Sequence, residues 1–261
     1  MARKSNKERL GIQSAEIAAV ILAAMAQAAQ PLPLKDLARR AKMPAGKVHR
    51  YLVSLTRSGL VAQESLTGHY RIGSAAIALG LAGLRSTDVV RCASELLLEL
   101  RDETRETALL AMWTEAGPAV IRLEESGRPV FMNIRVGSIL PLLRTATGRV
   151  FAAYLKTDEV KALLDREAKE QRKGGARNMQ AIETLLREIR YDGMAAISGD
   201  LVAGVAALSA PIFDHRGRIV AAIGVLGRAE DLAADPKSSA ARSLRHIAHQ
   251  VSSRLGYTAS A

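Results

Sequence analysis

The stretch MPAGKVHRYLVSLTRSGL, residues 43–60, shows most clearly how the first part of this chain folds. Its apolar side chains Val48, Leu52 and Leu55 fall within one narrow arc when the stretch is wound as a helix. The opposite arc carries cationic or hydroxyl side chains spaced three or four residues apart, namely Lys47, Arg50, Ser54 and Arg57. The pattern predicts an amphipathic helix over residues 45–58 that places one face in a core and leaves the other face cationic.

The segments on either side of this helix predict a winged helix-turn-helix. Apolar periodicity predicts a first helix over residues 14–29, capped by Ser14, and a short second helix over residues 34–41. Residues 60–63 and 69–72 are strand candidates around a glycine-containing turn. Three helices followed by a hairpin are the order of elements in that DNA-binding module.

The remainder of the chain predicts an α+β fold. Strand candidates cover residues 107–113, 119–124, 130–136, 194–198, 205–213 and 218–226. Helical patterns precede, separate and follow them, at residues 74–84, 88–104, 147–154, 158–169, 179–191 and 236–255. Three strands, a helical block and three more strands predict one antiparallel sheet with helices covering one side.

The charge is concentrated in the first third of the chain. The formal net charge is +11, and residues 1–85 hold thirteen Lys and Arg against four Asp and Glu. A cationic module of this kind indicates a polyanionic partner, and we expect double-stranded DNA. Aromatic residues make up only 3% of the chain, which argues against a base-stacking surface for single strands.

Cysteine content does not fix the compartment, but nothing in the sequence calls for an oxidising one. Cys92 is the only cysteine, so no disulfide can form within one chain. Residues 17–29, behind a basic start, mimic a secretory signal, but Glu16 and Gln27 interrupt the pattern, and we interpret the segment as a helix. Because no apolar run approaches the length of a membrane span, we expect a cytoplasmic protein with no membrane partner.

Signals for catalysis, metals and cofactors are weak. His246 and His249 are three residues apart on the last predicted helix, but no third ligand is near, and exposed helix histidines are the better interpretation. Gly174 and Gly175 lack the spacing and the Lys-Ser/Thr of a phosphate-binding loop. We therefore expect no catalytic residue, no metal and no cofactor.

The predicted DNA contacts lie on the third helix, the hairpin and the start of the first helix. Arginine can fork onto guanine in the major groove, while lysine and serine bind phosphates or base edges. The residues predicted to contact DNA are Ser14, Gly46, Lys47, His49, Arg50, Ser54, Arg57, His69 and Arg71. Tyr70 is either a further contact or partly buried against the third helix, and a merely solvated charged face is the competing interpretation.

These motifs resemble the IclR family of transcriptional regulators over nearly the whole chain. The resemblance rests on LKDLARRAKMPAGKVHRYLVSLTRSGLV at residues 34–61, LPLLRTATGRV at 140–150, GVAALSAPIFD at 204–214 and IVAAIGVLG at 219–227. It implies a homodimer or homotetramer with a winged helix-turn-helix domain, a linker helix and a GAF-like effector-binding domain. The domains expected are a basic tail at 1–11, the DNA-binding domain at 12–73, the linker at 74–87 and the effector domain at 88–261.

The sequence departs from the family pattern at three places. Gly46-Lys47 stands where the family usually has Ser-Thr, so we expect a different operator preference, although Arg50 matches the family's recognition-helix arginine. Gly148-Arg149-Val150 replaces Gly-Lys-Ala. The acidic pair before the late glycine is reduced to Asp200.

The resemblance also implies an effector pocket between the sheet and the helices that follow the third strand. Carried over by position, its lining is Leu143, Ala146, Thr147, Ile197, Val205, Ala207, Gly224 and Leu226. Family members that bind small oxoacids have Asp, Cys, Ser and Ser at the places of Ile197, Ala207, Gly224 and Leu226. Because an apolar pocket cannot offset the desolvation of a compact anion, we expect a larger or more apolar effector, such as an aromatic acid or related catabolite.

The resulting prediction is a DNA-binding transcriptional regulator, a repressor or an activator, whose operator binding responds to a small molecule. Two alternatives remain at this point. One is a sequence-independent DNA-binding protein with a vestigial pocket, and the other is an enzyme whose large domain acts on a small molecule.

Overall fold

The computed structural model describes residues 11–28, 30–86, 88–128, 134–172 and 179–258. The chain divides into two compact units, residues 1–86 and residues 87–261. Each unit has hydrophobic core clusters of its own. In the part of the chain that is described, no helix is both long and apolar enough to cross a membrane.

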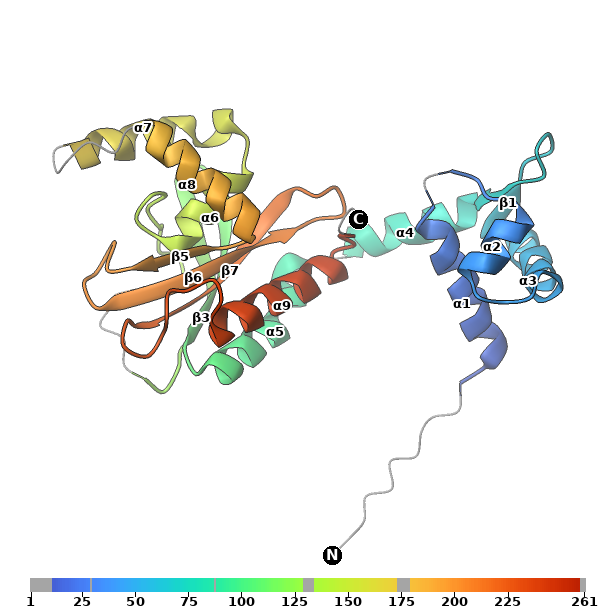
Figure 1. The fold of residues 1–261 in the computed structure, drawn as a ribbon, viewed down its shortest axis with the longest axis horizontal. Coiled ribbons are helices and arrows are strands. Elements are labelled where there is room, and N and C mark those ends of the chain that lie inside the picture. The colour runs from blue at the N-terminus through green and yellow to red at the C-terminus, as the bar shows by residue number, and fades with distance from the viewer. Residues whose placement is uncertain (1–10, 29, 87, 129–133, 173–178, 259–261) are drawn as a thin grey trace, which may run out of the picture. The chain divides into compact units, whose positions relative to one another are not determined.

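The N-terminal unit is a winged helix-turn-helix, as the sequence predicts (Figure 1). Its elements are α1 (Gln13–Ala26), α2 (Leu34–Arg40), α3 (Ala45–Arg57), β1 (Val61–Gln63), β2 (Tyr70–Ile72) and α4 (Ser74–Ser86). Strands β1 and β2 pair antiparallel as the wing. Lys42 makes the turn between α2 and α3 with a left-handed φ of 52°, and the Met43 amide then donates to the Ala38 carbonyl at 3.0 Å.

The amphipathic pattern of α3 produces the core of this unit. Val48 and Leu52 are fully buried and pack in one cluster with Ile21 of α1 and Leu37 of α2. Burying an aliphatic side chain of this size contributes about 1.5–3 kcal/mol. The cationic face of α3 is consequently turned away from the core.

The expectation that Ser14 caps the first helix is wrong. Helix α1 begins at Gln13, its N-cap position is Ile12, and no side chain caps it. Gln13 and Ser14 are both part of the helix. The Ser14 hydroxyl therefore lies in the first turn, past the cap position, and is exposed.

The C-terminal unit is built around a five-stranded antiparallel sheet of order β4-β3-β7-β6-β5. The strands are β3 (Thr107–Thr114), β4 (Gly117–Glu124), β5 (Ala195–Ser198), β6 (Val205–Phe213) and β7 (Ile219–Arg228). The helices are α5 (Val89–Thr104), α6 (Ala146–Tyr154), α7 (Thr157–Arg172), α8 (Met179–Asp192) and α9 (Ser239–Arg254). Of the strand expected at residues 130–136, residues 130–133 lie outside the described residues, and residues 134–136 are not in a strand.

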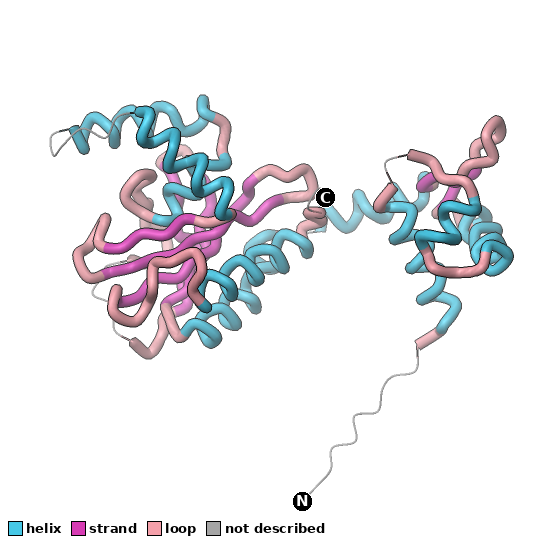
Figure 2. Tube along the Cα trace, viewed as in Figure 1, coloured by secondary structure: helices cyan, strands magenta, loops and turns pink. Residues whose placement is uncertain are grey.

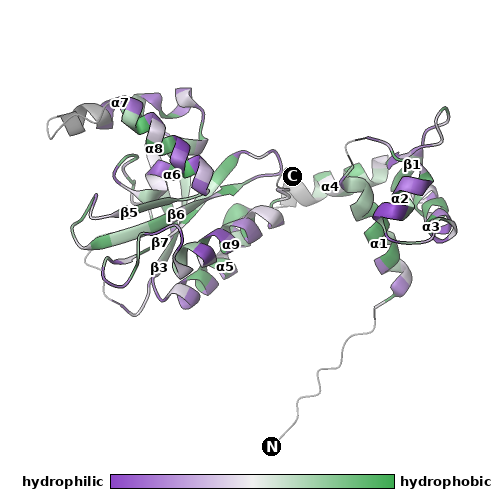
Figure 3. Ribbon diagram, in the orientation of Figure 1, coloured by the Kyte–Doolittle hydropathy of each residue, from purple (hydrophilic) through white to green (hydrophobic). Residues whose placement is uncertain are grey.

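Helices cover both faces of this sheet, so the expectation of one covered side is wrong (Figures 1 and 2). On one face, α5 and α9 pack on Leu110 and Ile223; on the other, α6, α7 and α8 pack over Leu109 and Ala222. Because successive strand residues point to opposite faces, strands that are apolar at nearly every position require two covered faces. The hydropathy of β6 and β7 in Figure 3 shows this apolar character.

Candidate nucleic-acid interface and ligand pocket

The outward face of α3 is a cationic surface. Helix α3 contains no acidic residue, and Lys47 is half-buried on this face. The other predicted contacts on the helix are exposed, namely Gly46, His49, Arg50, Ser54 and Arg57. The Ser54 hydroxyl contacts the Arg50 carbonyl at 3.5 Å, one turn back. A helix of this kind is able to place cations and a hydroxyl in a major groove.

The wing adds one exposed cation and one half-buried histidine. Arg71 is exposed and His69 is half-buried. Tyr70 is buried, with 6% of its surface exposed, and its backbone exchanges hydrogen bonds with Leu32 at 2.8 and 3.0 Å. Of the two alternatives for Tyr70, the structure therefore shows the buried one.

The tip of the wing holds a residue that sequence reasoning did not single out. Leu66 is fully exposed there, in a turn closed by a hydrogen bond from the Thr67 hydroxyl to the Glu64 carboxylate at 2.8 Å. Gly68 in the same turn has φ +70°, a left-handed conformation that glycine adopts without strain.

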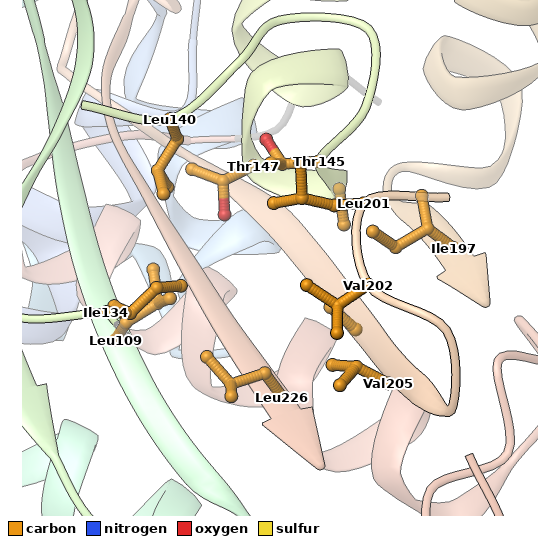
Figure 4. A pocket seen from close by; sticks show the side chains of 12 residues that line it. Leu109, Ile134, Leu140, Thr145, Thr147, Ile197, Leu201, Val202, Val205 and Leu226 are labelled. Carbon is orange, nitrogen blue, oxygen red and sulfur yellow. The ribbon is translucent and has the colours of Figure 1, made fainter. Parts of the chain in front are cut away.

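A pocket lies in the C-terminal unit between the sheet, the start of α6 and the loop after β5 (Figure 4). Six of the eight residues expected in an effector site line it together, namely Ala146, Thr147, Ile197, Val205, Ala207 and Leu226. Leu143 and Gly224 are not part of its lining. Leu143 is fully buried in the core beneath α6. A Cβ at Gly224 would lie only 2.8 Å from the Leu208 carbonyl oxygen, which shows how closely the two strands approach there.

The structure adds lining residues that the sequence analysis missed, namely Leu109, Ile134, Leu140, Thr145, Leu201 and Val202. Leu109 shares a sheet face with Ala111, and this alternation is visible in the sequence. Leu201 and Val202 belong to a loop, whose path no periodicity predicts. They reach the pocket only because the loop folds back over the sheet.

The chemistry of the pocket is apolar with one available hydroxyl. The Thr145 hydroxyl is occupied, because it donates to the Pro141 carbonyl at 2.6 Å and accepts from the Gly148 amide at 2.9 Å. The Thr147 hydroxyl points into the pocket in Figure 4, the residue is 4% exposed, and no partner for it is found among the described residues. Thr147 is also in the first turn of α6, where the helix dipole favours an anion.

The pocket is small. Its free volume is about 30 Å³, room for little more than a water molecule. A cavity that binds benzene measures about 150 Å³. An aromatic ligand therefore cannot enter unless the wall moves.

The described residues contain no group of three His, Cys, Asp or Glu side chains placed to hold a metal ion. His246 and His249 are both exposed on α9, and a ring nitrogen of His246 lies 2.8 Å from the Gln250 amide nitrogen. Cys92 is half-buried and packs against the core cluster of α5 and α9. These groups form no catalytic arrangement.

A winged helix-turn-helix followed by a separate α+β unit with a small apolar pocket is typical of one class of transcriptional regulators. Comparison with known families agrees with this class. The model described as "IclR helix-turn-helix domain" matches residues 14–65, and "Bacterial transcriptional regulator IclR C-terminal" matches residues 81–253. The chain belongs to the IclR family of transcriptional regulators.

Individual relatives are transcriptional regulators, not enzymes. The chain is 31% identical to the glycerol operon regulatory protein of Streptomyces griseus over 251 residues, covering 94% of this chain and 97% of that one. It is 27% identical to the HTH-type transcriptional regulator KdgR of Escherichia coli over 227 residues, 86% of each. The crystal structure of Pseudomonas aeruginosa HmgR superposes with a TM-score of 0.88 at 41% identity, covering 95% of this chain and 100% of that one.

Proposed function

We propose that this regulator binds a specific operator through α3 and the wing, and that a small molecule in the C-terminal pocket modulates that binding. The observation that carries the DNA-binding part is the face of α3, which combines three cations with exposed hydrogen-bonding groups and no acid. Lys47 and Arg57 suit phosphates, and Arg50 at the centre of the face suits guanine.

The proposed effector is an aromatic acid or a similarly apolar catabolite. Leu109, Leu140 and Leu226 offer apolar walls for a ring. The Thr147 hydroxyl offers a hydrogen-bond donor for one carboxylate, and the dipole of α6 favours the negative charge there. A compact oxoacid with two polar ends would leave one of them against these apolar walls, which costs free energy.

The proposed assembly is a homodimer or homotetramer in the cytoplasm. A pseudo-palindromic operator is read by two copies of α3, one for each half-site. The effector would change the populations of the assemblies that can span both half-sites.

Footprinting and gel-shift titration test the DNA-binding part. Arg50→Ala should weaken operator binding by about 1–3 kcal/mol. It should also reduce the difference in affinity between operator DNA and random DNA. Arg187→Ala, an exposed arginine on α8, removes the same charge from the other unit and serves as the matched control. An unchanged operator preference in the Arg50 variant would contradict the assignment, and protection of no site at any salt would favour sequence-independent binding.

A thermal-shift screen of aromatic and aliphatic acids tests the effector part. A ligand at one hundred times its Kd should stabilise the unit that binds it by about 2.7 kcal/mol and raise its melting temperature. Hits are then tested for operator release. The small free volume of the pocket also suits a vestigial site, and a screen without a hit would favour that alternative.

A further inference from the structure

The loop between β5 and β6, residues 199–204, forms one wall of the pocket. Leu201 and Val202 point from this loop into the pocket (Figure 4). The loop begins at Gly199 and ends at Gly204, and both have a φ of +76°. L-residues rarely adopt this conformation, so the two glycines are the positions at which the backbone turns most freely.

Two arginines from the segment around the start of α6 hold this loop in place. Arg144 donates through Nε to the Asp200 carbonyl and through Nη2 to the Leu201 carbonyl, each at 3.2 Å. Arg149 Nη2 forms an ion pair with the Asp200 carboxylate. The Arg149 guanidinium is itself oriented, because its Nε donates to the Leu143 carbonyl at 2.8 Å.

The burial of the ion pair makes it specific. Only 6% of the Arg149 side chain and 26% of the Asp200 side chain is exposed. A buried arginine needs its partner, since an unpaired buried charge is strongly unfavourable. Asp200 therefore has one favoured position, against Arg149, and this position places Leu201 and Val202 over the pocket.

The loop is better suited to move than α6, which forms another part of the wall. Helix α6 has eight buried residues and packs in the core cluster between the sheet and α8. The loop is half-buried at Asp200, Leu201 and Val202 and exposed at Ala203 and Gly204. Segments with few buried apolar contacts open at lower cost than packed helices.

We propose that residues 199–204 are the gate of the effector pocket, and that Arg144, Arg149 and Asp200 are positioning residues that hold it closed. The proposal rests on the effector pocket proposed above. When the ion pair separates, the loop swings about Gly199 and Gly204, Leu201 and Val202 withdraw, and the pocket becomes large enough for an aromatic ring. Closure re-forms the pair over the ligand.

Chemical labelling of a pocket cysteine tests the gate without any effector. Ala146 lines the pocket and is 1% exposed, so Ala146→Cys in a Cys92→Ser background places one thiol behind the gate. Iodoacetamide is the probe. Asp200→Asn and, separately, Arg144→Gln should each speed alkylation by at least about tenfold, because the closed state loses a charge-assisted contact. Asp192→Asn, an exposed aspartate at the end of α8, should leave the rate unchanged.

A second variant and a control for folding accompany the labelling test. Arg144 is exposed, so Arg144→Gln leaves no buried charge unpaired and decides the question if Asp200→Asn fails to fold. Hydrogen exchange of β6 and β7 amides, unchanged in each variant, shows that the sheet is intact. Equal alkylation rates in the parent chain and in every folded variant of Asp200 or Arg144 would overturn the proposal. The labelling needs no effector. If these variants change the alkylation rate but no screened acid binds, the gate stands and only the proposed effector is refuted.

Discussion

Asp214 and Arg218 close the turn between β6 and β7 as a tightly bonded ion pair. Arg218 Nε and Nη2 lie 3.0 and 2.8 Å from Asp214 Oδ2, while Oδ1 accepts the backbone amides of Arg216 at 2.8 Å and Arg218 at 3.0 Å. Burial raises the pKa of the Asp214 carboxyl, but the hydrogen bonds from Arg218 and Arg216 outweigh it and hold the pKa below its usual value. The turn therefore depends on an ionised carboxylate.

Asp214→Asn should lower the free energy of unfolding of the C-terminal unit by about 2 kcal/mol at pH 7. Because the folded pKa is lower than the unfolded pKa, this contribution is complete above about pH 5 and is lost as the pH falls through the folded value. Urea unfolding at pH 7 and at pH 3 measures it, with Asp192→Asn as an exposed control. If the variant and the parent chain differ in free energy of unfolding by the same amount at both pH values, the charge of Asp214 does not have this role.

Gly148→Ala should destabilise the C-terminal unit severely. A Cβ at Gly148 would lie 2.1 Å from the Pro141 carbonyl oxygen and 2.6 Å from Leu142 Cα, and neither backbone atom can move alone. We expect a loss of about 3 kcal/mol or more, or failure to fold. Gly127→Ala, where a Cβ meets nothing within 4 Å, is the matched control and should change stability by about 0.5 kcal/mol or less. Thermal unfolding measures the stability of both variants. Similar melting temperatures for the Gly148 and Gly127 variants would contradict the close approach of the Pro141 and Leu142 backbone to Gly148.

Thr147→Val should weaken binding of the aromatic acid that gives the largest thermal shift by about tenfold, because it removes one hydrogen-bond donor of about 1.4 kcal/mol. Stability of the unliganded chain should stay the same, since no partner for this hydroxyl is found within the described ranges. Thr145→Val is the contrasting variant and should cost about 1 kcal/mol of stability, because the Thr145 hydroxyl caps α6. Calorimetric titration and thermal unfolding separate the two effects. Equal ligand affinity in Thr147→Val and the parent would place the carboxylate elsewhere.

Gly46→Ser with Lys47→Thr should change which operator is preferred while leaving the fold intact. A Cβ at Gly46 meets nothing within 4 Å, and Lys47 lies on the outward face of α3, so both new side chains fit. A changed contact to one base pair alters the difference in binding free energy between the right and the wrong base by about 1–3 kcal/mol. Selection from a random DNA pool, performed with both chains, measures the change. The same selected sequence in both cases would show that these positions do not read bases.

The N-terminal unit could be predicted closely from local patterns. The two faces of α3 follow from helix periodicity, which acts over one or two turns and needs no distant partner. The expected bounds of α2, α3 and the wing strands agree with the structure to within one residue. Ser14 failed as a cap because helix ends depend on small differences among neighbouring residues.

In the C-terminal unit, the apolar patterns predicted the five strands and the helices that the structure shows, together with a strand at residues 130–136 whose described part, residues 134–136, is not in a strand. The apolar character of the pocket could also be predicted. Only the folded chain shows that helices cover both faces of the sheet. The apolar pattern of a strand does not say which helices pack on which of its faces. The tertiary structure also brought Arg149 to Asp200 across 51 residues and carried Leu201 and Val202 over the pocket. Such contacts arise from chain topology and from the cost of leaving a buried charge unpaired, and no local pattern encodes them.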